Sequence, residues 1–232
     1  YIPSGVVSGV WDLFAKWSVN ANEMYNLAVK YDDKNMQAIA LTLKAFYVSN
    51  PTDCFGDIPY SEAYTIYGQS PVKKMKFDDQ RSVYISIYED LELANSLYAT
   101  GDTFEGASKD LLYNGDLTKW KKFTNSLYLR LLMRLSNRVN EITFGDPAVT
   151  IPQKMQEIVT SSSKYPVLES LEDAAVLNYT GVAPFQNKFG SEANMNSRRA
   201  AEYTVKRMGE SRDPRMDCDY IHSGTVWNGK KR

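Results

Sequence analysis

The residues best suited to hold a ligand are aromatic and amide side chains in the least helical part of the chain. From Ser161 to Ser197 the hydrophobic periodicity fades, and between Asn178 and Asn196 aromatic rings occur together with asparagines and glycines. Aromatic faces stack on apolar surfaces, and amides donate to and accept from hydroxyl groups. This combination predicts recognition of a hydroxyl-rich ligand, with ordinary loop packing as the alternative for each residue. The first candidates are Tyr179, Phe185, Asn187 and Asn194, followed by Tyr220 and Trp227.

Acid–base or metal chemistry has one candidate cluster of carboxylates, which consists of Asp213, Asp217 and Asp219. A catalytic carboxylate pair must face across a cleft at about 5–10 Å, and nothing in the sequence indicates that arrangement. The single histidine, His222, excludes a histidine-based metal cluster. Cys54 and Cys218 fit no metal-binding spacing, and whether they form a disulfide stays open. The sequence therefore predicts no enzyme, no metal and no cofactor.

The composition limits the classes of partner. The chain has 232 residues with 27 basic and 28 acidic side chains, so no general field attracts nucleic acid or anionic lipid. No run approaches the roughly 18 apolar residues of a membrane span. Aromatic residues make up 12% of the chain, including 16 tyrosines, which favours a binding protein. The chain begins at Tyr1 rather than Met, which indicates a trimmed start, so localisation cannot be read from it.

The elements that must position these side chains are amphipathic helices, because apolar residues recur at three-and-four spacing. In the first of them, Trp11 and Trp17 both lie on the apolar stripe and are expected in the core. Acidic residues that can cap a helix precede the second, third and fourth, and Pro152 suits the first turn of the fifth. The expected helices span residues 6–31, 35–49, 78 or 79 to 98, 116 or 118 to 135, 151–160 and about 197–209.

One face of the fourth helix is basic. No aromatic side chain is interleaved with these charges, as base stacking would require, so a solvated or acid-paired face is predicted rather than a nucleic-acid surface. The basic residues are Lys119, Lys121, Lys122, Arg130, Arg134 and Arg138.

A compact turn is expected after the second helix, at Phe55–Tyr60. Asn50-Pro51 should end that helix, because proline lacks a backbone donor and disfavours the helical conformation of the residue before it. Gly56 tolerates a positive φ, Asp57 can bond the local backbone, and Pro59 sets the exit direction.

Four segments together resemble the SusD/RagB family of surface glycan-binding lipoproteins. The helix and turn of Ala38–Ala63 are similar to its signature loop, and Tyr88–Ala94 is similar to its next helix. Gly115–Leu131 resembles its most recognisable helix, and Arg212–Arg215 matches an Asp-Pro-Arg segment. Their order and approximate spacing agree with the family. The residues that carry the resemblance, and that it assigns to the scaffold, are Phe55, Gly56, Asp57, Pro59, Tyr60, Trp120, Asp213, Pro214 and Arg215.

The resemblance implies an all-α fold of tetratricopeptide-like helix pairs with long irregular loops. It implies a single domain over residues 1–232, with a helical scaffold in 1–160 and a loop-rich part with one further helix in 161–232. Family members are longer, so the chain is expected to be the N-terminal part of a longer protein. No strict thirty-four-residue repeat is visible in the sequence, so the repeat comes from the family alone.

The function implied by the resemblance is non-catalytic binding of an oligosaccharide or polysaccharide at the outer membrane. The partners would be the glycan and a TonB-dependent, SusC-like transporter, with no nucleic acid. A surface lipoprotein would reach the membrane only through a lipid anchor, whose signal and acceptor cysteine this sequence lacks. The alternative is a tetratricopeptide-like scaffold that binds a peptide or protein. A helical glycosidase is a third hypothesis, and it would require a carboxylate pair in a cleft.

Overall fold

The computed structural model describes residues 4–64, 74–98, 104, 106–179, 181–182 and 202–214. The chain divides into two compact units, Tyr1–Leu177 and Asn178–Arg232. The described helices of the first unit are α1 (Ser4–Asp12), α2 (Val19–Lys30), α3 (Lys34–Phe55), α4 (Tyr60–Ala63), α5 (Gln80–Leu97), α6 (Leu117–Arg134) and α7 (Ile151–Thr160). In the second unit, the described part contains α9 (Glu202–Glu210).

Shorter elements complete the first unit. A π-helical segment, η1 (Leu13–Ser18), joins α1 to α2, and 3-10 turns η2 (Ala107–Lys109), η3 (Ser136–Arg138) and η4 (Leu171–Asp173) lie in connections. Strands β1 (Thr143–Phe144) and β2 (Val149–Thr150) pair antiparallel in a two-stranded hairpin, with Thr143 opposite Thr150. The fold is therefore all-α, as predicted, with one small hairpin that the sequence did not indicate.

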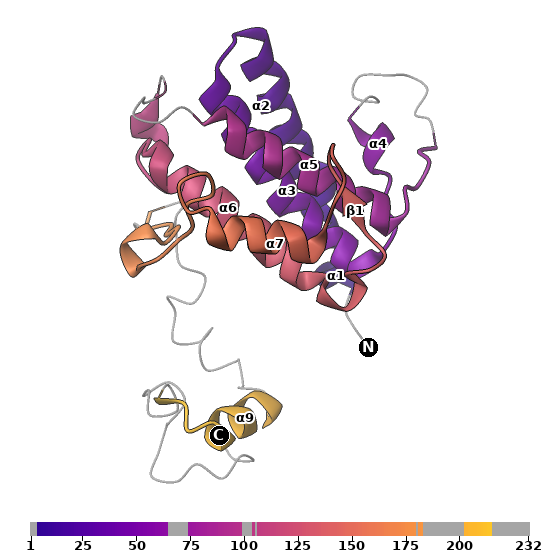
Figure 1. The fold of residues 1–232 in the computed structure, drawn as a ribbon, viewed down its shortest axis with the longest axis vertical. Coiled ribbons are helices and arrows are strands. Elements are labelled where there is room, and N and C mark those ends of the chain that lie inside the picture. The colour runs from indigo at the N-terminus through magenta and orange to yellow at the C-terminus, as the bar shows by residue number, and fades with distance from the viewer. Residues whose placement is uncertain are drawn as a thin grey trace. The chain divides into compact units, whose positions relative to one another are not determined.

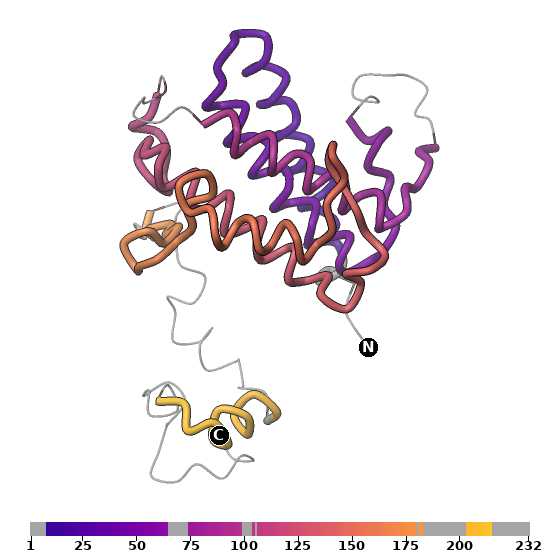
Figure 2. Tube along the Cα trace, viewed as in Figure 1, coloured from indigo at the N-terminus to yellow at the C-terminus, as the bar shows by residue number. Residues whose placement is uncertain are grey.

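The helices of the first unit form a layered bundle (Figure 1). Helix α3 packs against both α2 and α5, and α6 packs against α5, α3 and α7. The tube trace follows the chain through these packed helices (Figure 2). Consecutive helices thus lie side by side, as the helix pairs of a tetratricopeptide-like scaffold do.

The caps of the helices follow the predicted chemistry. Asp33, Asp79 and Asp116 are the N-caps of α3, α5 and α6, and each side chain accepts a hydrogen bond from a backbone N–H in the first turn. Thr150 and Gln153 form a capping box at α7, which also has a proline in its first turn.

The prediction for Trp17 is wrong, because its side chain is 50% exposed. The cause is the π-helical segment, whose wider turn shifts the buried face by one position relative to a regular α-helix. Ser18 takes the buried place instead, with Phe14 one turn before it and Ala21 after it. Trp11 is partly buried and packs against the main core, as expected.

The prediction that Asn50-Pro51 ends a helix is also wrong, because α3 continues through Pro51 to Phe55. In the turn before the proline, the carbonyl of Phe46 accepts hydrogen bonds from Ser49 Oγ at 3.0 Å and Asn50 Nδ2 at 2.9 Å. The carbonyl that loses its helical donor at Pro51 is that of Tyr47, one residue later. Pro51 itself is buried. Packing of the last turns therefore offsets the cost of about 3 kcal/mol that a proline imposes on a helix interior.

Two apolar clusters fill the bundle. The larger one includes the buried tyrosines Tyr84, Tyr88, Tyr128 and Tyr165, and the smaller one lies around Trp120. Between them, three hydroxyls connect α3, α6 and the end of α5: Thr42 Oγ1 lies 2.7 Å from Thr124 Oγ1, which lies 3.0 Å from the Tyr98 hydroxyl. Buried hydroxyls that satisfy one another in this way hold three helices in one register.

Candidate functional site

Of the six ligand-binding candidates in the sequence, the structure describes one. Tyr179 is 60% exposed, so its ring is available to a ligand. The other five, Phe185, Asn187, Asn194, Tyr220 and Trp227, lie outside the described residues. Cys218 and Arg215 lie outside them as well, whereas Cys54 is a free, exposed cysteine.

The turn Phe55–Tyr60 connects the end of α3 to the start of α4 and is hydrogen-bonded to the start of α5. Gly56 has a φ of 78° and caps α3, a conformation that favours glycine. Asp57 Oδ1 accepts a hydrogen bond from the backbone N–H of Gln80 at 3.0 Å, and Ile58 forms a bridge with Asp78. Pro59 is buried, and the Phe55 ring lies edge-on to Trp11, with centroids 5.5 Å apart.

A buried ion pair between α3 and α5 contacts the last residue of this turn, Tyr60. Lys44 Nζ lies 2.8 Å from Asp90 Oδ2, with side-chain exposures of 11% and 18%. The Tyr60 hydroxyl donates to the same carboxylate at 3.0 Å, and the ammonium group lies 5.4 Å from the centre of the Tyr60 ring. Burial, followed by the negative charge of Asp90, raises the pKa of Tyr60 well above its usual value. The signature turn is therefore attached to the scaffold by charge as well as by packing.

Trp120 of α6 is likewise a buried aromatic residue that is hydrogen-bonded to a carboxylate. It is 2% exposed, and its indole N–H donates to Asp110 Oδ2 at 2.7 Å. The same carboxylate oxygen accepts from the backbone N–H of Gly115 at 3.0 Å. Asp110 thus orders the loop that precedes the helix. Of the Asp-Pro-Arg segment, the structure describes Asp213, whose N–H bonds the carbonyl of Met208, and an exposed Pro214.

One cleft of the first unit has a volume of about 570 Å³ and lies among α5, α6, α7 and the hairpin. We call it the acidic cleft, because four carboxylates, Glu89, Glu92, Asp146 and Glu157, and two ammonium groups, Lys154 and Lys164, line it. Its apolar wall includes Tyr88, Tyr128 and Phe144. The volume and the mostly apolar wall with a few polar groups are typical of small-molecule sites.

A charged network forms one side of the acidic cleft. Lys154, whose side chain is 8% exposed, contacts Glu157 at 2.6 Å and Glu92 at 3.1 Å. The Tyr165 hydroxyl donates to Glu92 at 2.6 Å, and Lys164 lies 2.8 Å from Glu157. Burial alone would raise the pKa of Glu157, but the hydrogen bonds from Lys154 and Lys164 outweigh it and lower this pKa to about 2.

One hydroxyl in the wall of the acidic cleft has no partner. Tyr128 is fully buried, and its hydroxyl makes no hydrogen bond with any residue that the structure describes. Burial, then the nearby Glu92, raises its pKa, so the group stays protonated. Buried polar groups are normally satisfied, so this hydroxyl is an exception among the described side chains.

The network around Glu157 predicts acid sensitivity. Its folded-state pKa of about 2 lies below the ordinary 4.5, so its contribution to stability is present above about pH 4.5 and is lost as the pH falls toward 2. Allowing for a side chain that is 34% exposed, we expect the loss to be about 1–2 kcal/mol. Chemical denaturation at pH 5 and pH 3 should show this decrease in wild type but not in Glu157→Gln. Glu172→Gln, an exposed position outside the acidic cleft, should behave as wild type. An unchanged pH dependence in Glu157→Gln would contradict the prediction.

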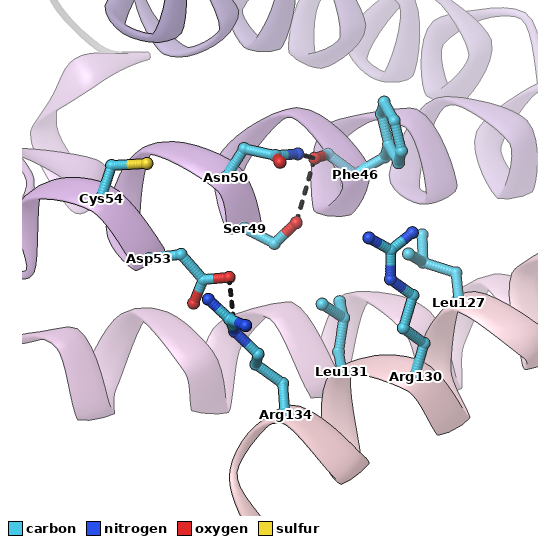
Figure 3. Close-up of a pocket in the computed structure, with 9 residues that line it drawn as sticks. All are labelled: Phe46, Ser49, Asn50, Asp53, Cys54, Leu127, Arg130, Leu131 and Arg134. Carbon is cyan, nitrogen blue, oxygen red and sulfur yellow. Dashed lines mark hydrogen bonds and ion pairs between the residues drawn. The ribbon is translucent and has the colours of Figure 1, made fainter. Parts of the chain in front are cut away.

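A smaller cleft, of about 220 Å³, lies between α3 and α6, and we call it the arginine cleft (Figure 3). It is lined from α3 by Phe46, Ser49, Asn50, Asp53 and Cys54, and from α6 by Leu127, Arg130, Leu131 and Arg134.

The basic face of α6 is largely paired with acceptors, as predicted. Lys119 donates to the carbonyl of Glu172, Lys122 pairs with Asp173 at 3.0 Å, and Arg134 pairs with Asp53 at 3.0 Å. Beyond the helix, Arg138 pairs with Glu141 at 2.9 Å. Burial lowers the pKa of Lys121. Arg130 is the member that stands apart, since it forms no hydrogen bond or ion pair with any residue that the structure describes.

The described residues offer two clefts as candidate binding sites. Within them, no group of three or more histidine, cysteine, aspartate or glutamate side chains is placed to hold a metal ion. None of the described helices combines the length and the apolar character that crossing a membrane requires. The paired helices and the two clefts are therefore those of a helical scaffold protein whose surface has sites large enough for small ligands.

The family follows from comparison with known proteins. Residues 2–230 match the SusD-like family described as "Starch-binding associating with outer membrane". The chain belongs to this family. No curated protein matches it.

Solved structures support the same assignment. A SusD homologue from Bacteroides fragilis is 27% identical with a TM-score of 0.66, over 88% of this chain and 41% of that one. A SusD homologue from Bacteroides uniformis is 26% identical with a TM-score of 0.53, over 70% and 30%. A SusD/RagB family protein from Bacteroides thetaiotaomicron, 23% identical, shares the fold with a TM-score of 0.65, over 87% and 39%. The chain thus spans about two fifths of the length of the first of these.

The sequence did not identify either cleft as a site. Lys154 and Glu157 were visible as neighbours on one helix, but Glu92 lies 62 residues before Lys154. The sequence does contain one indication of the arginine cleft: Arg130 has no acidic residue three or four positions before or after it on the helix.

Proposed function

We propose that the protein is a non-catalytic glycan-binding component of an outer-membrane nutrient importer. The observation that carries the proposal is the family match over residues 2–230, whose description names starch binding and association with the outer membrane. The partner would be a TonB-dependent, SusC-like transporter that receives the glycan, and a lipid anchor would hold the protein at the cell surface. The single-domain organisation of residues 1–232 belongs to the same proposal.

The acidic cleft is the place in the first unit where we propose that a sugar unit binds. Carboxylates accept hydrogen bonds from sugar hydroxyls, ammonium groups donate to them, and aromatic or aliphatic walls contact the apolar faces of the ring. Glu89 lies on the cleft but outside the network of Lys154, so it is free to accept from a ligand.

Isothermal titration against a panel of neutral polysaccharides tests this proposal. We expect binding by wild type and a loss of about tenfold or more in affinity for Glu89→Gln, because a hydrogen bond to a charged group contributes about 1.5–3 kcal/mol. Glu172→Gln should bind as wild type does. Absence of binding to every polysaccharide would contradict glycan binding, and equal binding by Glu89→Gln would place the glycan elsewhere. Release of reducing sugar from any polysaccharide would overturn the non-catalytic assignment.

A further inference from the structure

The arginine cleft differs from the acidic cleft in charge. Among its lining residues two guanidinium groups, Arg130 and Arg134, stand against one carboxylate, Asp53. Asp53 is already engaged twice, because it accepts from the Tyr84 hydroxyl at 2.6 Å and pairs with Arg134 at 3.0 Å. Arg130 is therefore left as a positive charge without a counter-charge in the described part of the chain.

The position of Arg130 suits the capture of an anion. Arg130 and Arg134 are one turn apart on α6, and the stick view shows both side chains rising from this helix toward α3 (Figure 3). A guanidinium group offers planar N–H donors whose geometry matches a carboxylate. Because the cleft contains two guanidinium groups and one carboxylate, an incoming monoanion would balance its charge. A dianion would leave an excess of negative charge beside Asp53.

The remaining walls provide groups for the rest of a ligand. From α3, the side chains of Ser49 and Asn50 extend toward the cleft and use their donors on the Phe46 carbonyl. The acceptor oxygens of both side chains stay available for ligand hydroxyls. Leu127 and Leu131 form an apolar wall on α6. The small volume, about 220 Å³, suits one ring rather than an extended chain.

We propose that the arginine cleft binds the carboxylate of a uronic acid, with Arg130 as its principal charge partner. The carboxylate lies on the guanidinium group, the hydroxyls of the ring face Ser49 and Asn50, and its apolar face lies against the leucines of α6. The choice of a sugar as the source of the carboxylate rests on the proposed function. The protein would then hold acidic units of a glycan at a position separate from the acidic cleft, which disfavours anions.

Titration calorimetry with galacturonate, its methyl ester, galactose and acetate separates the contribution of the carboxylate charge to binding from that of the sugar ring. We expect galacturonate to bind wild type, and its methyl ester and galactose to bind at least tenfold more weakly, because they lack the charge. Acetate should also bind more weakly, because it lacks the ring. In Arg130→Gln the affinity for galacturonate should fall about tenfold or more, as for loss of a charge-assisted hydrogen bond. Arg138→Gln, which removes a nearby exposed arginine outside the cleft, should leave it unchanged.

Several outcomes would overturn the inference. Failure of galacturonate to bind, or equal affinity in Arg130→Gln and wild type, removes the site. Equal binding of acetate and galacturonate removes the sugar from the proposal, and tighter binding of inorganic phosphate than of galacturonate removes the preference for a monoanion. Binding of neutral polysaccharides that persists in Arg130→Gln distinguishes a failure here from a failure of the proposed glycan-binding function.

Discussion

Replacing Asp90 with alanine is expected to lower the free energy of unfolding by about 3–5 kcal/mol. The substitution leaves the Lys44 ammonium group buried without its carboxylate, since the Lys44 side chain is only 11% exposed. It also removes the acceptor of the Tyr60 hydroxyl. For a domain of this size the melting temperature should fall by roughly 10 °C. Urea denaturation followed by circular dichroism would measure both the stability and the slope of the transition.

Two further variants test whether the stability loss in Asp90→Ala comes from leaving the Lys44 charge buried and unpaired. Glu141→Ala breaks the Arg138–Glu141 pair, whose side chains are 65% and 56% exposed, so its cost should stay within about 1 kcal/mol. The double variant Lys44→Met/Asp90→Leu replaces the buried pair with apolar groups, and it should recover much of the stability lost in Asp90→Ala. If Asp90→Ala costs no more than Glu141→Ala, the ion pair does not hold the signature turn.

Replacing Gly115 with alanine should destabilise the protein by about 2–5 kcal/mol in total. The backbone there has a φ of +83°, which costs a non-glycine residue about 1–2 kcal/mol. In addition, an added Cβ would lie 2.3 Å from Ala107 Cβ, so η2 or the start of α6 must move. Because Gly115 N–H and Trp120 Nε1 share one oxygen of Asp110, such a movement should also disturb the indole. Denaturant titration monitored by tryptophan fluorescence reports both effects.

Gly106 offers a matched control for this substitution. Its φ is +82°, almost the same as that of Gly115, yet an added Cβ meets nothing within 4 Å. Gly106→Ala should therefore cost only the backbone term of about 1–2 kcal/mol. The difference between the two variants isolates the contact with Ala107. Equal stability losses in the two variants would show that the loop adjusts without cost, contrary to the prediction.

Much of the fold could be predicted from local patterns. Periodicity located the helices, and the expected capping residues, which included Asp33, Asp79 and Asp116 among close alternatives, marked three of their starts. This was possible because N-capping depends on a side chain and the backbone three residues away. The two errors concern departures from regular geometry. At Trp17 a π-turn moved the buried face, and at Pro51 tertiary packing carried a helix through a residue that disfavours it.

The sites were less predictable than the scaffold. Of the sequence candidates, Tyr179 is exposed as a ligand-binding residue requires, and the hypothesis for the other five stays a prediction. The clefts were not predicted, because each depends on side chains from helices that are far apart in the sequence. Arg130 illustrates the limit: its charge is visible in the sequence, but the lack of a partner is a property of the packed bundle.

The sequence by itself determined the helices, their caps and the resemblance to the SusD/RagB family, since these depend on residue type and short spacings. Tertiary structure alone decided where charge is balanced. It brought Glu92 to Lys154 and Asp90 to Lys44, and it left Arg130 uncompensated between α3 and α6. The physical reason is that pairing of charges depends on distances through space, which helix packing sets and local sequence does not encode.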